Sequence, residues 1–490
     1  MRAACGTPEH HHYRSAMTLR TRRRRHLPIV RRTLLLGAAS VTCAIFAFQA
    51  PGASAASSAY APTRILVKYA TATPARARAT VARAAGAGKP SVTAPHTRLL
   101  HLARGVSVGA ALHRLRRERD VVWAVPDYRA RVAGAPGPLI PNDRGEGDTA
   151  GDWQQLQWNF SGPFGVGAPQ AWANVAANGA PGGKGVIVAV LDTGVAYATH
   201  GRFKRSPDFS RYGFVGGYDF IAHNHFPDDR NGHGTFVAGT IAEATNNRLA
   251  VTGLAFASRI MPVRVLDSPG EGEASTIAEG VRYAVKHGAQ VINLSLEFSS
   301  SVTASDIPEL IEALRYARRR GVLVVAAAGN EAHTAIAYPA RAPDVVAVGA
   351  TTEHGCLADY SNDGSGLTLV APGGGADANL PGDPNCHAES PAGRDVFQET
   401  FTGSSPRRFG LPSGYEGTSM AAPHVAATAA LLIASGVLGK HPTPAQLIAR
   451  MRATARKLGG GGDEALYGAG LLDAAAATAP VAAVTPVASG

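Results

Sequence analysis

Five short apolar runs rich in valine and isoleucine constrain the fold of this chain more than any other feature. Each run lacks alternation of polar and apolar residues, and a helical pattern follows it. Strands that helices cover on both faces have this composition. The sequence therefore predicts an α/β fold with a parallel, doubly wound sheet, whose active crevice lies at the carboxyl ends of the strands. The runs are 186–191, 259–266, 291–296, 322–327 and 345–350.

Positive charge is concentrated at the front of the chain. Residues 1–133 contain 23 Lys and Arg but 4 Asp and Glu, whereas residues 134–490 contain 25 and 32. Phosphate binding needs a basic surface on the folded unit, so the acidic body argues against a nucleic-acid partner. The asymmetry favours a basic front segment that docks on an acidic body.

The first 55 residues have the pattern of an export signal. A basic stretch at 22–25 and the pair Arg31-Arg32 precede an apolar run over 34–48, and small residues at 53–55 offer a cleavage site. We expect a secreted, extracellular protein, and both the general secretory and the twin-arginine routes remain open. The apolar run is shorter than the ~20 residues of a membrane anchor, so no membrane contact is expected after signal removal.

Composition divides the remaining chain into four parts. Residues 56–133 alternate strand and helix patterns and predict a small α+β unit. Residues 134–151 are rich in Gly, Pro and Asp, which predicts an exposed linker with a processing site. The apolar runs lie in a main domain over 152–475, and the uncharged segment 476–490 is predicted to be a frayed tail.

Three segments each place a reactive polar residue at the edge of an apolar element. They are 188–194 with Asp192, 231–239 with His233, and 417–424 with Ser419. Serine is a weak nucleophile, so it needs a histidine to take its proton and a carboxylate to orient that histidine. Together the three segments supply a candidate acid, base and nucleophile.

These three segments resemble the motifs of the subtilisin family (subtilases, peptidase family S8), in which acid, base and nucleophile occur in the same order. The similarity extends from about residue 158 to 473. It implies a three-layer subtilisin-like fold and a serine endopeptidase that hydrolyses polypeptides through an acyl-enzyme. It further implies a monomer without a catalytic cofactor, active at neutral to alkaline pH where His233 is unprotonated.

The resemblance also implies a second oxyanion donor and several substrate subsites. Asn330 follows the apolar run 322–327 and matches the family's oxyanion asparagine. By the same resemblance, Ser295 and Leu296 form an edge that pairs with extended substrate, and Ala327 and Gly329 line the pocket for the substrate side chain.

Two positions depart from the family pattern. Glu297 stands where the family usually has glycine; its carboxylate could favour basic substrate side chains, together with Glu331, or it could point to solvent. Phe236 stands where the family often has histidine, and we expect it to alter packing and not catalysis.

A structural calcium site is a further implication of the resemblance. The segment 245–251 resembles a calcium loop of the family in position and length. Backbone oxygens of Thr245, Leu249 and Val251 with the Asn247 side chain would form an oxygen cage. Asp208 is the expected carboxylate ligand.

Four cysteines occur, and two of them, Cys5 and Cys43, lie in the segment expected to be removed. Cys356 and Cys386 remain as a pair in an exported body, which predicts a disulfide. Closing a loop of roughly 30 residues would stabilise the fold by about 3 kcal/mol.

The front unit resembles the family's ferredoxin-like propeptide, which assists folding and inhibits the enzyme. With 14 basic and 3 acidic residues over 56–133, its charge suits docking on the acidic body. The chain would then be a precursor that matures by cleavage, with its own propeptide as a partner. A catalytically silent relative is the main alternative, whereas an esterase would need Gly-x-Ser-x-Gly and a sedolisin would use glutamate as base.

Overall fold

The computed structural model describes residues 60–88, 90–128, 137–460 and 463–480. It divides into two compact units, which we call the small unit (up to Tyr128) and the large unit (from Arg129), and each is described by itself. The signal predicted over 1–55 lies outside the described residues.

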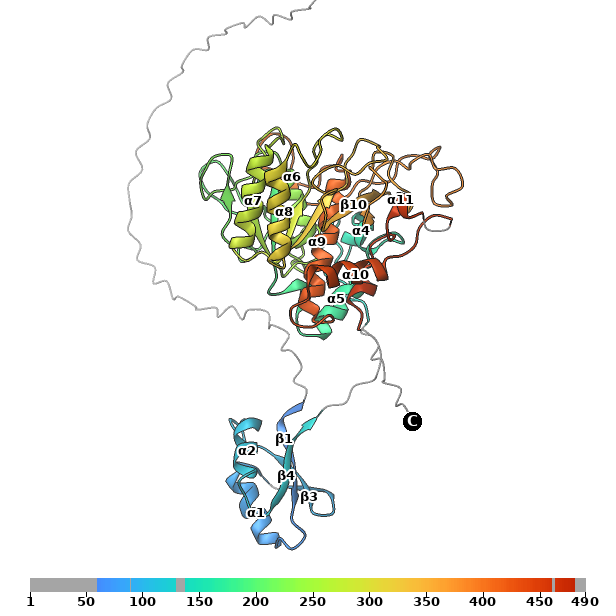
Figure 1. Ribbon diagram of the computed structural model, residues 1–490. Coiled ribbons are helices and arrows are strands. Elements are labelled where there is room, and N and C mark those ends of the chain that lie inside the picture. Colours follow the sequence, from blue (N-terminus) through green and yellow to red (C-terminus); the bar gives the residue numbers. More distant parts are fainter. Residues whose placement is uncertain (1–59, 89, 129–136, 461–462, 481–490) are drawn as a thin grey trace, which may run out of the picture. The chain divides into compact units, whose positions relative to one another are not determined.

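The small unit is a four-stranded antiparallel sheet with two helices (Figure 1). Its strand order β2-β3-β1-β4 and its βαββαβ succession are those of ferredoxin-like folds, as predicted. Ile65, Val67, Leu100 and Leu115 are completely buried between sheet and helices. The elements are β1 (Tyr60–Tyr69), α1 (Ala75–Ala84), β2 (Ser91–Ala94), β3 (Thr97–His101), α2 (Val108–Leu115) and β4 (Val121–Tyr128).

The large unit is built on a seven-stranded parallel sheet with the order β11-β10-β9-β8-β5-β7-β6. The five predicted runs form β5, β7, β8, β9 and β10, whereas the short β6 and β11 carry too little apolar sequence to be found alone. The strands are β5 (Ile187–Asp192), β6 (Tyr218–Asp219), β7 (Arg259–Arg264), β8 (Val291–Leu294), β9 (Leu323–Ala327), β10 (Val345–Thr351) and β11 (Leu369–Pro372).

Helices cover both faces of this sheet and give the predicted three layers (Figure 1). Alternate residues of β5 enter opposite cores: Val188 and Val190 face the core that contains α9, while Ala189 and Leu191 face the one that contains α7 and α8. The helices are α3 (Trp153–Leu156), α4 (Trp158–Ser161), α5 (Ala168–Ala177), α6 (His233–Ala242), α7 (Ala274–Lys286), α8 (Pro308–Arg319), α9 (Thr418–Ser435), α10 (Pro444–Thr454), α11 (Glu464–Tyr467) and α12 (Ala474–Thr478). The short pair β12 (Thr400–Phe401) and β13 (Phe409–Gly410) lies outside the sheet.

Helix α9 is long and apolar enough to span a membrane, but 83% of that stretch is buried inside the large unit. Ala421, Ala422, Ala426 and Ala429 are fully buried, and such small side chains let the helix lie close to the sheet. Core packing therefore accounts for the apolarity of α9.

The exposed linker expected over 134–151 is in part a folded segment of the large unit. Asp143 is fully buried, and its carboxylate accepts hydrogen bonds from the backbone N–H groups of Asn246 (2.7 Å) and Asn247 (2.9 Å). The Gly, Pro and Asp content that suggested a linker also suits a turn-rich segment packed on another loop.

The large unit also extends beyond the expected end at 475. Ala477 and Thr478 of α12 are fully buried, and the Asn174 side-chain amide donates to the Thr478 hydroxyl at 3.2 Å. The predicted tail therefore begins later than 476, and residues 481–490 lie outside the described part of the chain.

Candidate active site

The carboxyl end of β5 and the start of α6 bring Asp192 and His233 together. Asp192 is completely buried, and its Oδ1 atom lies 2.8 Å from Nδ1 of His233. The same oxygen accepts the backbone N–H of Thr193 at 2.7 Å, which fixes the carboxylate. Strands β7 and β8 flank β5 on its two sides, so the pair lies at a topological switch point of the sheet.

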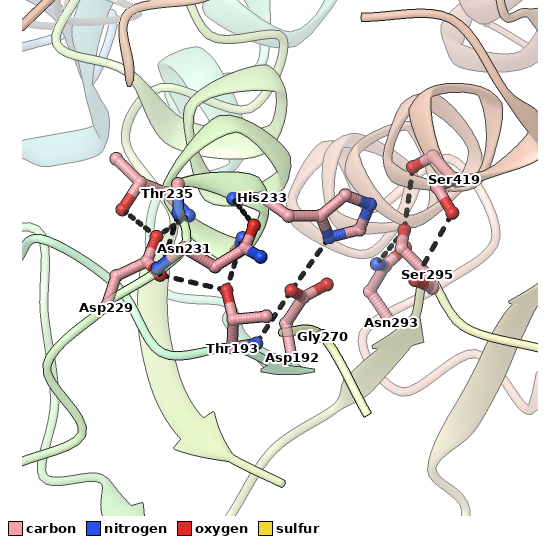
Figure 2. A network of polar contacts seen from close by, with 12 residues as sticks. Asp192, Thr193, Asp229, Asn231, His233, Thr235, Gly270, Asn293, Ser295 and Ser419 are labelled. Carbon is pink, nitrogen blue, oxygen red and sulfur yellow. Dashed lines mark hydrogen bonds and ion pairs between the residues drawn. The ribbon is translucent and has the colours of Figure 1, made fainter. Parts of the chain in front are cut away.

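A second buried carboxylate, Asp229, orders the loop that presents His233. It accepts the backbone N–H groups of Asn231 (2.9 Å), Gly232 (3.0 Å) and Thr235 (3.0 Å). It also accepts the hydroxyls of Thr193 and Thr235, as Figure 2 shows. Asp229 is only 1% exposed, so these hydrogen bonds hold the loop from the interior.

The surroundings of His233 favour its protonated form. Burial alone would lower the pKa of the imidazole, but the charge and hydrogen bond of Asp192, aided by the charge of Asp229, raise it above the ordinary value of 6.5. The imidazole is therefore a stronger base than an isolated histidine.

Ser419 lies in the first turn of α9 and is linked to the residue that follows β8. The Ser419 hydroxyl donates to the backbone carbonyl of Ser295 at 3.3 Å, and the Ser295 hydroxyl donates to the carbonyl of Ser419 at 2.7 Å. Figure 2 shows the imidazole of His233 between Asp192 and this serine pair. In this conformation the Ser419 hydroxyl points at Ser295 and not at the imidazole.

A cleft of about 490 Å³ opens over these side chains. His233, Ser419, Ser295, Leu296 and Glu297 contribute to its lining. The structure thus brings the candidate base, the candidate nucleophile and the predicted substrate edge to one cavity.

Asn330 is held beside the start of α9. Its Oδ1 atom accepts the backbone N–H (2.8 Å) and the hydroxyl (2.9 Å) of Thr418, which turns the amide nitrogen the other way. That nitrogen donates to Glu297 at 3.1 Å, and the backbone N–H of Asn330 donates to the same carboxylate at 2.9 Å. Glu297 does not point to solvent, so that alternative is wrong.

The two residues expected to line a substrate side-chain pocket differ in position. Gly329 lies against the cleft wall, where an added Cβ would come within 2.6 Å of a carboxylate oxygen of Glu297. Ala327 ends β9 and is buried in the core, with 1% of its surface exposed. Gly329 is thus the closer of the two to the cleft.

Phe236 fills the interior beside the histidine loop. It is fully buried, and its ring stacks on Tyr415 with centroids 4.3 Å apart and planes 6° from parallel. These contacts agree with the expectation that phenylalanine at position 236, where the family often has histidine, alters packing.

Three buried carboxylates form a second cluster, which we call the carboxylate cluster: Asp208, Glu243 and Glu399. One oxygen of each lies within 4.8 Å of the others. Neither oxygen of Glu243 has a hydrogen-bond partner within the described residues. Burial raises the pKa of all three carboxyl groups. Because calcium and magnesium prefer oxygen ligands, this cluster of carboxylate oxygens could bind a metal ion.

The predicted calcium loop lies beside this cluster. The amide nitrogen of Asn247 donates to Asp208 at 2.6 Å, and its oxygen accepts the N–H of Leu249 at 2.8 Å. The N–H of Val251 donates to Asp208 at 3.4 Å. The Thr245 hydroxyl donates to the Glu243 carbonyl at 3.1 Å and accepts the N–H of Gly253 at 3.2 Å. The amide of Asn247 would have to turn over before its oxygen could face a cation near Asp208.

The predicted disulfide is confirmed. Cys356 and Cys386 are bonded, with Cα atoms 4.8 Å apart. The bridge ties the segment that follows β11 to the segment that follows β10.

Sequence reasoning missed four acidic residues that shape these sites: Asp143, Asp229, Glu243 and Glu399. The first two bind loop N–H groups, and the others bring negative charge into the interior. Asp229 had one local signal, since an acidic side chain two residues before Asn-Gly can accept the N–H groups of a turn.

Comparisons with known proteins agree with this site. The model of the subtilase family matches residues 183–470, which include Asp192, His233 and Ser419. Subtilisin BL of Lederbergia lenta is 40% identical over 318 residues, which are 64% of this chain and 98% of that protein. Thermitase of Thermoactinomyces vulgaris is 35% identical over 301 residues, which are 61% and 90% of the two chains. Among solved structures, a protease of Pseudoalteromonas arctica PAMC 21717 superposes with a TM-score of 0.54 at 30% identity, covering 70% of this chain and 98% of that one.

Proposed function

Because this chain belongs to the subtilase family and is a subtilisin-like serine endopeptidase, we propose that Asp192, His233 and Ser419 are its catalytic acid, base and nucleophile. The observation that carries the proposal is the 2.8 Å contact between His233 and buried Asp192, beside a serine at the start of a helix. An Nδ1–H that donates to Asp192 leaves Nε2 of His233 as a proton acceptor.

The reaction would begin with a rotation of the Ser419 side chain. Its hydroxyl turns from the Ser295 carbonyl to Nε2 of His233, loses its proton to that nitrogen and attacks the substrate carbonyl. His233 then gives the proton to the leaving amine, so an ester with Ser419 remains. Water hydrolyses this ester with His233 again as base.

The developing oxyanion would be stabilised by Asn330 and by the start of α9. The first N–H groups of a helix lack partners within the helix, and the backbone N–H of Ser419 is one of them. The side-chain amide of Asn330 is the second donor. In subtilisin itself, removing that donor costs roughly 100- to 1000-fold in kcat.

A structural calcium ion fits the carboxylate cluster. Calcium prefers carboxylate and carbonyl oxygen, and unpartnered Glu243 offers two buried oxygen atoms. Asp208 and the 245–251 loop remain the predicted ligands, with Glu243 and Glu399 near them. Such an ion would neutralise buried charge and cross-link the loops, and it would take no part in bond cleavage.

Maturation would remove the small unit by a cut N-terminal to Asp143. A cut beyond Asp143 would separate this buried carboxylate from the loop N–H groups that it binds. The basic small unit acts as the propeptide of an exported precursor. As a propeptide it would inhibit the enzyme by binding to it, and the opposite net charges of the two units favour such binding.

Mass spectrometry of the wild type and of Ser419→Ala, after incubation with a serine-reactive sulfonyl fluoride, tests the proposal. The wild type should lose its front segment and gain the probe on Ser419, whereas the variant should stay full length and unlabelled. A folded wild type that neither matures nor reacts would be a catalytically silent relative.

A further inference from the structure

Glu297 reaches across the candidate site and binds the loop of Asn330. Its two carboxylate oxygens accept the backbone N–H (2.9 Å) and the side-chain N–H (3.1 Å) of Asn330. Burial raises the pKa of this carboxyl, and the two hydrogen bonds from Asn330 oppose that rise. A half-buried carboxylate therefore binds the amide that the proposed reaction uses as an oxyanion donor.

The carboxylate also joins the cleft lining to the segment of Gly329 and Asn330. Glu297 directly continues the edge formed by Ser295 and Leu296, and its carboxylate approaches the Cβ position of Gly329 to 2.6 Å. A side chain at 329 would clash with the Asn362 amide nitrogen as well as with this carboxylate, so glycine leaves room for both groups. Glu297 thus lies where a substrate side chain next to the scissile bond would enter.

The negative charge of Glu297 would slow the reaction by repelling the oxyanion, unless a cation neutralises that charge. One amide nitrogen of Asn330 would donate both to Glu297 and to the oxyanion, so the two negative charges would lie about 5 to 6 Å apart. At an effective dielectric constant of about 20, their repulsion slows the reaction by roughly 100-fold. A cation beside Glu297 would remove that penalty.

We propose that Glu297 makes this endopeptidase selective for substrates with arginine or lysine on the acyl side of the scissile bond. The inference rests on the proposed function of Ser419 and Asn330. A guanidinium or ammonium group pairs with the Glu297 carboxylate, which then leaves Asn330 free to serve the oxyanion. Arginine suits the site best, because its parallel N–H groups match a carboxylate in two hydrogen bonds.

The experiment compares chromogenic peptides that differ in that one residue: arginine, lysine, leucine or phenylalanine. Wild type is measured beside Glu297→Gln, Glu297→Gly and the control Glu312→Gln. Glu312 serves as the control because it is an exposed glutamate of α8 that does not line the cleft. Titration with a sulfonyl fluoride counts the folded, reactive Ser419 in each preparation.

The wild type should favour arginine over leucine by roughly 100-fold or more in kcat/KM per titrated site. Both Glu297 variants should lose activity on arginine and gain it on leucine, while Glu312→Gln changes either rate less than a few fold. A wild type that titrates fully yet prefers leucine or phenylalanine overturns the selectivity, as do Glu297 variants that keep the wild-type ratio. Failure of Ser419 to react would instead overturn the proposed function, and this inference with it.

Discussion

Replacing Glu243 by glutamine would test whether the carboxylate cluster holds a cation. Burial raises the pKa of Asp208 from 3.8 to about 8, and it also raises the pKa values of Glu243 and Glu399. Without a cation, the folded state keeps protons that the unfolded chain has already released. The free energy of unfolding should therefore fall as pH rises from about 4 to about 8.

The size of this effect follows from the Asp208 shift. About four pKa units at 1.4 kcal/mol each give on the order of 5 kcal/mol at alkaline pH. A folded unit of roughly 340 residues unfolds with about 2.1 cal/mol/K of entropy per residue, so this loss lowers Tm by about 7 °C. A bound calcium ion would offset it, because metal binding to the folded state alone adds to stability.

Thermal unfolding of the Ser419→Ala protein, which should not digest itself, is the assay. Chelator should lower Tm by about 7 °C near pH 8.5 and much less near pH 5.5. Glu243→Gln should raise Tm in chelator at the higher pH, because it relieves repulsion, yet it should reduce the gain from added calcium. Equal chelator effects at both pH values, with Glu243→Gln lowering Tm equally with and without calcium, would refute the reasoning.

Three further results are expected. In Asp229→Asn, kcat/KM should begin to rise at a lower pH than in the wild type, because the Asp229 charge helps to raise the pKa of His233. An unchanged pH–rate profile would contradict this. Burial lowers the pKa of His424 to about 4, so this histidine is neutral in the folded state. Its contribution to the free energy of unfolding is complete above about pH 6.5 and is lost as pH falls toward 4. Urea unfolding should show up to about 3 kcal/mol of destabilisation by acid, and less in His424→Gln. Replacing both Cys356 and Cys386 by alanine should cost about 3 kcal/mol in the same assay, and an unchanged midpoint would argue against stabilisation by loop closure.

The parts of the fold that the sequence predicted are those with a strong local signal. The central strands lie within a few residues of the predicted runs, because buried parallel strands have continuous apolar sequence. Asp192 and His233 could be singled out because each lies at the end or start of such an element. Their 2.8 Å contact then follows from the fold.

The parts that could not be predicted depend on contacts between distant segments. Asp143 binds a loop more than 100 residues away, and Glu297 and Asn330 are 33 residues apart. Neither pairing leaves a local pattern, since only the packing of loops brings the partners together. For the same reason the composition of residues 134–151 predicts a linker, and the sequence does not determine the direction of the Glu297 side chain.

The position of α9 along the chain has a consequence for the cell that makes this protein. Asp192 and His233 are synthesised well before Ser419, which arrives with the helix that fills the core of the large unit. A nascent or truncated chain that ends before residue 418 lacks both the proposed nucleophile and the helix on which the sheet packs. Proteolytic competence should therefore be absent until Ser419 and α9 have been synthesised, and fragments that end before them should be harmless to their producer.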